Sequence, residues 1–317
     1  RETSLAESQT SDAFVAFERV QKSYDGETLV VKDLNLSMPK GEFLTMLGPS
    51  GSGKTTCLMM LAGFETATHG KILLDGVSIN NIPPHKRGIG MVLQNYALFP
   101  HMTVAENLSF PLEVRKIGKS DREAKVKRAL DMGEMGAFGG RRPAQLSGGQ
   151  QQRIALARAL VFEPELVLMD EPLGALDKQL REKMQFEITD LAHNLGITVV
   201  YVTHDQTEAL TMSDRVAVCD DGRSQQIDAP DTLYESPQNS IVAQFIGENT
   251  KLDATVREVN GERATVSFDS GESCEALAIN CGSPGSKALL SIRPERVVVG
   301  SSSSANSTEG KVLELIY

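Results

Sequence analysis

Residues 48–55 read Gly-Pro-Ser-Gly-Ser-Gly-Lys-Thr, a spacing that could bind a polyphosphate. They fit the pattern G-x-x-x-x-G-K-[ST], the phosphate-binding P-loop. A P-loop lies between a buried strand and a helix, which are predicted here over 42–47 and 56–62. Glycines let backbone N–H groups approach phosphate oxygens closely, and a helix N-terminus adds partial positive charge. Lys54 could then reach the β- and γ-phosphates and Thr55 could offer its hydroxyl to Mg²⁺. A glycine-rich turn that happens to hold a lysine is the alternative, and it leaves the flanking strand and helix without a role.

Two carboxylates, Asp170 and Glu171, follow a second apolar run at Leu166–Met169. An aspartate at such a strand end can hold the Mg²⁺ shell of a P-loop site. The neighbouring glutamate could orient or deprotonate a water molecule. The competing interpretation of Glu171 is an ion-paired loop acid.

Ser147, Gly148 and Gly149 open another predicted helix, and a helix start of this kind can bind an anion. Alone the signal is weak, because Ser-Gly-Gly is also an ordinary loop and cap. Its position after a P-loop and just before a second apolar strand makes it stronger. The chain has one P-loop and two such helix starts, so two copies of the chain could share their sites.

Strands that alternate with helices predict an α/β fold with a parallel sheet covered on both sides. Ligand-binding groups in such sheets lie at the carboxyl ends of the strands. In this chain the predicted strand ends carry the P-loop, Gln94, the pair Asp170-Glu171 and His204. We therefore expect these polar groups to meet at one edge.

Other patterns predict the elements around this edge. Residues 14–24 and 30–38 read as strands of an antiparallel piece, and Asp75-Gly76 indicates a hairpin between 70–74 and 77–79. Further predicted elements are a helix that starts at a capping box over 120–123, a mobile glycine-rich connector over 133–143, a helix over 178–194 that stops at Gly196, and a short helix over 206–212.

The composition limits what the chain can be. Its 317 residues allow one large domain and a smaller one, and a net charge of −10 argues against nucleic acid as a partner. None of the four cysteines is paired at metal-ligand spacing, which favours buried or free thiols in a reducing compartment. No apolar run approaches the roughly 18 residues that span a bilayer.

The pattern predicts three segments: a disordered tail over 1–13, an α/β domain over 14–247, and a small all-β domain over 248–317. In the last segment short β-rich runs alternate with turns, and the runs include 297–299. A polar loop over 301–310 and a final strand at Lys311–Tyr317 follow. We expect this β-rich domain to be truncated, because the final strand has nothing after it.

Taken together, these motifs resemble the ATP-binding subunits of ABC transporters, over roughly 15–246 and more weakly through the tail. Residues 48–55 match the Walker A motif, Gln94 the Q-loop, 146–150 the signature motif, 166–170 Walker B, 175–177 the D-loop and His204 the H-loop. The resemblance implies a P-loop ATPase domain with a helical subdomain at about 95–150, followed by a barrel of the oligonucleotide-binding type. One departure is the glycine-rich stretch 133–140, where relatives are usually less flexible.

The resemblance also assigns roles to individual residues. For ATP binding within one subunit it implies Tyr24, Pro49, Ser50, Gly51, Ser52, Gly53, Lys54, Thr55, Thr56, Gln94 and Asp170. For binding ATP held by a second copy it implies Ser147, Gly148, Gly149, Gln150 and Asp177. For catalysis it implies Glu171, His204 and Lys54, and for Mg²⁺ it implies Thr55, Gln94 and Asp170.

The implied function is an ATPase that powers import of a small solute through a membrane permease. Its partners would be a second copy of itself, the permease subunits and, indirectly, a periplasmic solute-binding protein, at the cytoplasmic face of a bacterial inner membrane. Residues 245–249 resemble polyamine importers more than sugar importers, which favours spermidine or putrescine, with ferric iron, sulfate or a sugar as alternatives. A non-transport ABC ATPase and a small-molecule kinase are the rival functions, and the kinase leaves 146–150 without a role.

Overall fold

A computed structural model describes residues 13–298 and residue 306. The described chain forms two compact units, with the division between Pro230 and Asp231. The sequence placed this division between residues 247 and 248. Residues 1–12 of the tail predicted over 1–13, and the predicted final strand at Lys311–Tyr317, lie outside the described residues. No helix in the described part of the chain is long and apolar enough to cross a membrane.

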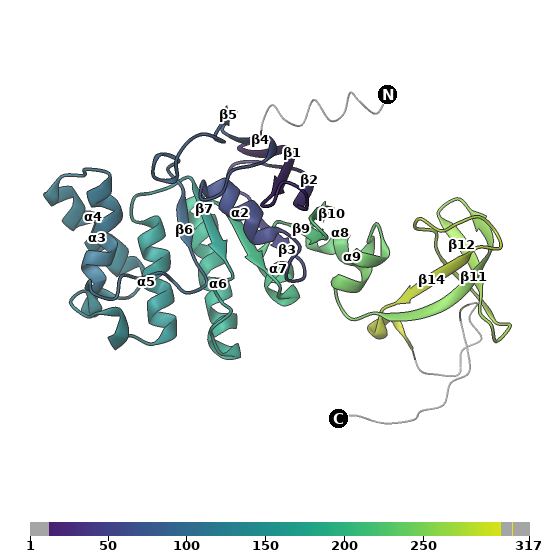
Figure 1. The fold of residues 1–317 in the computed structure, drawn as a ribbon. Coiled ribbons are helices and arrows are strands. Elements are labelled where there is room, and N and C mark those ends of the chain that lie inside the picture. Colours follow the sequence, from purple (N-terminus) through teal and green to yellow (C-terminus); the bar gives the residue numbers. More distant parts are fainter. Residues whose placement is uncertain (1–12, 299–305, 307–317) are drawn as a thin grey trace. The chain divides into compact units, whose positions relative to one another are not determined.

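A six-stranded sheet of order β10-β9-β3-β8-β7-β6 forms the centre of the first unit (Figure 1). The strands are β3 (Phe43–Leu47), β6 (Gly90–Val92), β7 (Leu166–Asp170), β8 (Thr198–Thr203), β9 (Arg215–Asp220) and β10 (Arg223–Asp228). The five strands from β9 to β6 pair in parallel, and β10 joins the edge antiparallel to β9 through a turn. The parallel sheet is as predicted, whereas β10 was not predicted.

Side chains of the central strands alternate between two apolar clusters, because successive residues of a strand point to opposite faces. On β7, for example, Leu166 and Leu168 pack on one face, and Val167 and Met169 on the other. The first face meets α2 (Lys54–Ala62), and the second meets α5 (Gly148–Leu160) and α6 (Lys178–Leu195) (Figure 1). Burial on both faces explains why these strands read as continuous apolar runs.

A separate antiparallel sheet of order β2-β1-β4-β5 covers the outer side of α2. Its strands are β1 (Val15–Ser23), β2 (Leu29–Met38), β4 (His69–Leu74) and β5 (Val77–Ser78). Asp75 and Gly76, between β4 and β5, have φ values of 49° and 72°. Positive φ at both central residues is what a two-residue type I′ hairpin requires, so the predicted hairpin is confirmed.

Helices α3 (Val104–Val114) and α4 (Lys119–Met132) pack against α5 and form a third apolar cluster. The predicted capping box at Ser120 is wrong, because α4 begins at Lys119 after Gly118 and has no side-chain cap. Capping boxes are found instead at Thr103, before α3, and at Ser147, before α5. The local pattern at Ser120 failed because the N-cap is Gly118, two residues earlier, so Ser120 already lies inside the helix.

The glycine-rich stretch after α4 packs against its neighbours, and its predicted mobility stays a prediction. Met135 is buried in the third cluster, and the carbonyl of Gly139 accepts a hydrogen bond from the Ala105 N–H at 2.9 Å. Two short 3₁₀ helices, Gly136–Phe138 and Pro143–Gln145, fill the remainder. The stretch is thus held against the start of α3 by a backbone hydrogen bond and an apolar contact.

The second unit combines two short helices with a four-stranded antiparallel sheet of order β13-β12-β11-β14. Its elements are α8 (Pro230–Glu235), α9 (Ser240–Phe245), β11 (Thr250–Asn260), β12 (Arg263–Ser267), β13 (Ser273–Leu277) and β14 (Lys287–Ile292). The described strands form an open sheet, and the strand predicted at 297–299 is absent at 297–298, after a 3₁₀ turn at Pro294–Arg296.

Arg293 explains why the division of the chain precedes α8. Its guanidinium donates to the carbonyls of Tyr234, Ala243 and Glu248 and stacks on the Tyr234 ring at 4.5 Å. These contacts fix α8 and α9 to the segment that follows β14. Helices this short carry no periodicity that would predict them from the sequence.

Candidate functional site

The P-loop connects β3 to α2 in a conformation that its glycines make possible. Gly51 and Gly53 have φ values of 82° and 93°, the left-handed region that side chains rarely adopt. A Cβ on Gly48 would lie 2.1 Å from the carbonyl oxygen of Cys219, and one on Gly53 would lie 2.9 Å from that of Val30. The neighbouring strands therefore require glycine at these positions, and the loop backbone stays free to meet a ligand.

Lys54 is the first residue of α2, and its ammonium folds back over the loop. It donates hydrogen bonds to the carbonyls of Gly48 and Pro49, both at 2.8 Å, and to the Ser52 hydroxyl at 3.2 Å. The side chain is only 5% exposed, and burial lowers its pKa. A buried cation held by neutral oxygens gains most from an anion, so this position suits a phosphate group.

Thr55 and Asp170 bring the ends of the P-loop and of β7 together. The Thr55 hydroxyl donates to Oδ1 of Asp170 at 3.1 Å. Burial raises the pKa of the Asp170 carboxyl, while the Thr55 hydrogen bond and the Lys54 charge oppose that rise. A hydroxyl and a poorly solvated carboxylate are the oxygen donors that Mg²⁺ takes in nucleotide sites, so these residues fit the metal.

Glu171 lies between Gln94 and His204. Its Oε1 is 3.0 Å from Nδ1 of His204, and its Oε2 accepts a hydrogen bond from Nε2 of Gln94 at 3.3 Å. Glu171 itself has φ 44°, and its N–H donates to the carbonyl of Val202 at 2.9 Å. The strained backbone turns the carboxylate across the strand ends, where it meets side chains from the segments after β8 and after β6.

Tyr24 offers an exposed ring beside the start of α2. It is 59% exposed, and its hydroxyl lies 3.5 Å from that of Thr56. The ammonium of Lys22 lies 4.7 Å from the ring centroid. One face of the ring is thus available to stack on a flat ligand, as expected for an adenine.

The residues assigned to a second subunit lie at other helix ends. Ser147 caps α5 through a reciprocal pair of hydrogen bonds with Gln150, at 3.3 Å and 3.0 Å. Asp177 caps α6 by accepting from the N–H of Leu180 at 3.0 Å. A Cβ on Gly149 would lie 2.8 Å from Cδ2 of Leu180, so glycine lets the two helix starts approach closely. Ser147 and Asp177 thus make N-capping hydrogen bonds within their own helices. Within the single chain, no described hydrogen bond joins them to the P-loop.

The structure reveals supporting residues that sequence reasoning missed. Arg158 on α5 donates to the carbonyls of Tyr96 and Ala97, at 2.8 Å and 2.7 Å, just after Gln94. Tyr96 and Ala97 have φ values of 60° and 46°. Arg158 therefore stabilises a strained turn that sets the position of Gln94. The sequence carries no signal for this contact, because the partners are backbone oxygens about sixty positions away.

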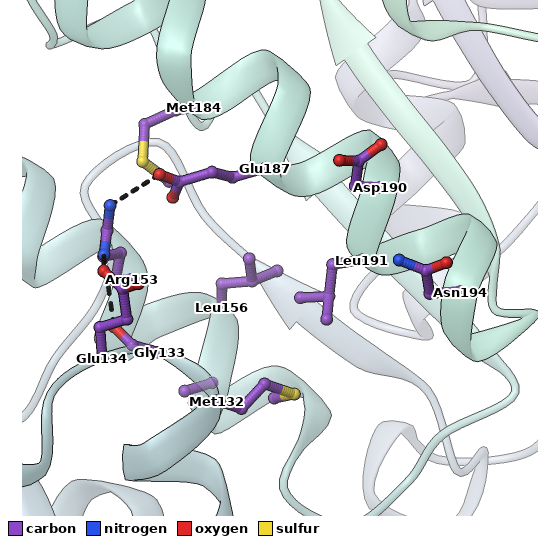
Figure 2. A pocket seen from close by; sticks show the side chains of 11 residues that line it. Met132, Gly133, Glu134, Arg153, Leu156, Met184, Glu187, Asp190, Leu191 and Asn194 are labelled. Carbon is purple, nitrogen blue, oxygen red and sulfur yellow. Dashed lines mark hydrogen bonds and ion pairs between the residues drawn. The ribbon is translucent and has the colours of Figure 1, made fainter.

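A cavity of about 330 Å³ lies elsewhere in the first unit, between α5, α6 and the end of α4. Figure 2 shows Arg153 at its rim, paired with Glu187 and Glu134 at 2.7 Å and 3.1 Å. None of the predicted site residues lines this cavity. The candidate site is therefore the cluster of loops at the strand ends.

Known proteins are similar to this chain in sequence and in fold. The ABC transporter family matches residues 31–174. The spermidine/putrescine import ATP-binding protein PotA of Pseudomonas aeruginosa (strain UCBPP-PA14) is 48% identical over 296 residues, which cover 92% of this chain and 82% of that protein. The protein of the same name from Rubrobacter xylanophilus is 47% identical over 305 residues, covering 96% and 80%.

Among solved structures, the dimeric post-hydrolysis state of an ATP-binding cassette bound to ADP and Pi matches with a TM-score of 0.62 and 34% identity. The match covers 68% of this chain and 98% of that one. Identity at this level over most of the chain establishes the family, and the P-loop site described above is consistent with it. The chain belongs to the ATP-binding proteins of ABC transporters and is an ATPase of that family.

Proposed function

We propose that this chain hydrolyses ATP to power the import of a polyamine through a membrane permease. The observation that carries the proposal is the meeting of Lys54, Thr55, Asp170, Glu171 and His204 at neighbouring strand ends. These side chains supply a phosphate-binding cation, two Mg²⁺ ligands and a carboxylate placed to act on water.

ATP would bind along the P-loop, with its adenine stacked on Tyr24. The Lys54 ammonium would exchange its carbonyl partners for oxygens of the β- and γ-phosphates, since charged acceptors bind it more strongly. Residues 50–56 would contribute backbone N–H groups and hydroxyls to the same phosphates, and Pro49, which has no N–H, would contact them without donating. Thr55, Asp170 and the amide oxygen of Gln94 would hold Mg²⁺, which when bound neutralises charge on the phosphate oxygens.

Glu171 would then act as the general base. Asp170 already accepts a hydrogen bond from Thr55 and is assigned to the metal, which leaves Glu171 to take the proton of an attacking water. Its two oxygens are held by Gln94 and His204, so the carboxylate has one orientation. His204 would in turn contact the γ-phosphate and keep phosphate and water in line.

The second set of residues completes each site from a second copy. Ser147, Gly148, Gly149 and Gln150 would present a hydroxyl and helix N–H groups to the γ-phosphate held by the partner, and Asp177 would approach the same interface. This arrangement explains why the phosphate-ready start of α5 lies apart from the P-loop of its own chain. The dimeric cassette structures among the relatives support it.

The names of the relatives support spermidine or putrescine as the solute. The permease would meet the subunit through the helical subdomain, with residues 96–104 as the contact surface, at the cytoplasmic face of the inner membrane. A periplasmic solute-binding protein would deliver the polyamine. The second unit would regulate the ATPase.

Two assays test the proposal in order. The purified chain should hydrolyse ATP in the presence of Mg²⁺, and Lys54→Ala should weaken ATP binding and abolish turnover, because positioning alone does not replace the lost charge. Proteoliposomes holding the chain with its permease should then take up labelled spermidine at the expense of ATP. Uptake of ferric iron, sulfate or a sugar instead would reject the polyamine while leaving the ATPase assignment intact.

A further inference from the structure

A buried polar network lies directly behind His204. Its centre is Glu208 on α7 (Gln206–Met212), which is only 3% exposed. One of its oxygens accepts hydrogen bonds from the hydroxyls of Tyr201 and Thr203, both at 2.8 Å. Burial raises the pKa of the Glu208 carboxyl, while these two hydrogen bonds oppose the rise. Because both donors belong to β8, Glu208 fixes α7 against the strand that ends just before His204.

Asp205, the residue after His204, belongs to the same hydrogen-bond network. Its N–H donates to the Thr203 hydroxyl oxygen at 3.0 Å, and its carboxylate accepts from the N–H groups of Thr207 and Glu208 at 2.8 Å and 3.2 Å. The Thr203 hydroxyl is therefore a donor to Glu208 and an acceptor from Asp205. Both neighbours of His204 are held by this network, so its geometry sets the direction of the imidazole.

Arg181 extends the network to the D-loop. From α6 it donates to the Asp205 carboxylate at 3.3 Å and to the carbonyl of Leu176 at 3.1 Å. Its Nε lies 3.9 Å from Oε1 of Glu208, which is within ion-pair distance and too long for a hydrogen bond. Leu176 directly precedes Asp177. One rigid guanidinium thus joins the residue before Asp177 to the residue after His204, a span that a flexible ammonium with a single charge centre does not reproduce.

We propose that Arg181 and Glu208 are positioning residues that couple the D-loop at Asp177 to His204. This inference rests on the proposed dimer, in which Asp177 meets the partner subunit. Movement of residues 176–177 on dimer formation would pass through Arg181 to Asp205 and direct His204, which already lies beside Glu171, toward the γ-phosphate. Hydrolysis would then follow only when the partner is in place, although neither Arg181 nor Glu208 touches ATP.

Kinetics of the full chain test the coupling. Arg181→Ala should lower kcat by about 10- to 100-fold, as expected for a misplaced catalytic group, and leave KM for ATP within about twofold. Arg181→Lys should recover only part of the loss. Glu208→Gln keeps an oxygen that can accept from Tyr201 and Thr203, so it should lower kcat less than Glu208→Ala does. The matched control is Arg153→Ala. Arg153 lies on α5 and its guanidinium also has two carboxylate partners, so this variant removes a similar group and should leave kcat within about twofold.

A double-mutant cycle separates coupling from a general loss of structure. If Arg181 acts through Asp177, the kcat of the double variant Asp177→Ala/Arg181→Ala should be close to that of the slower single variant. If the two losses multiply, the residues act independently and the inference is wrong. Inactivity of the unaltered chain would instead reject the proposed function, so the two failures differ.

An imidazole NMR spectrum gives a readout that turnover does not. The chain has five histidines, so the His204 signal can be assigned with a His204→Ala sample. Arg181→Ala should shift the His204 signal in the free protein, and Arg153→Ala should leave it in place. A thermally stable Arg181→Ala protein with an unmoved His204 signal and unchanged kcat would overturn the proposal.

Discussion

Nδ1 of His204 lies 3.0 Å from Oε1 of Glu171, although the two residues follow the ends of different strands and are thirty-three positions apart. Parallel pairing of β7 with β8 places these strand ends side by side. The positive φ of Glu171 then turns its carboxylate toward the imidazole. This pair is the part of the site on which the chemical step should depend most.

Glu171→Gln should slow hydrolysis by about 10²–10⁴-fold, the range expected when a general base is lost. The amide keeps the shape and can still accept from Gln94, so ATP binding should survive. The variant should then accumulate as an ATP-bound dimer, which size-exclusion chromatography with Mg²⁺-ATP detects. Turnover at the parent rate, or a monomer at saturating ATP, would reject Glu171 as the base.

Asp170→Asn should abolish hydrolysis. At neutral pH it should nevertheless raise the stability of the nucleotide-free protein. Burial raises the pKa of the folded-state carboxyl above its unfolded value, so the charged form costs stability at neutral pH, and this cost disappears as pH falls below the unfolded value. The asparagine removes the charge and keeps an oxygen for the Thr55 hydroxyl.

Thermal melts without nucleotide measure this effect. The melting temperature of Asp170→Asn should exceed that of the parent by on the order of 2 °C at neutral pH, and the gap should close as the pH is lowered toward 4. A gap that widens on acidification has the wrong sign for a buried carboxylate and would contradict the electrostatic argument.

Ser147→Arg should spare ATP binding to the single chain and stop hydrolysis, because a long cation would occupy the start of α5 where the γ-phosphate of the partner is expected. In mixed dimers with Lys54→Ala, one site has both residues intact and the other lacks both. Mixing two inactive variants should therefore restore turnover, although coupling between sites can change its size. Activity that is independent of dilution in the parent protein would argue against shared sites.

Arg293→Ala should destabilise the second unit by about 1–3 kcal/mol, because three carbonyls lose a charged donor and the Tyr234 ring loses its cation. The control Arg296→Ala removes only an exposed ion pair with Glu235 and should cost about 0–1 kcal/mol. Both variants should keep the ATPase activity of the first unit. Equal costs in a denaturant titration would show that the carbonyl contacts of Arg293 do not stabilise the unit.

The sequence alone determined the type of site and most of the sheet that carries it. The P-loop is recognisable because its chemistry is local: glycines, a lysine and a hydroxyl lie within eight consecutive residues. Gln94, Asp170 and His204 could be assigned to one edge because parallel strands share the direction of their carboxyl ends. Apolar runs such as Leu166–Met169 were readable as strands because both sheet faces are covered.

Only the tertiary structure decided the features that depend on distant partners. Gly48 faces a carbonyl of Cys219, and Arg181 bridges Leu176 and Asp205, contacts that no local pattern encodes. The same holds for the division of the chain, because Arg293 ties α8 and α9 to a segment more than forty residues further on. Ser120 has a capping pattern and caps nothing, whereas Thr103 caps α3. Where a helix begins is settled by how the chain enters it from its neighbours, and that information is spread over the whole fold.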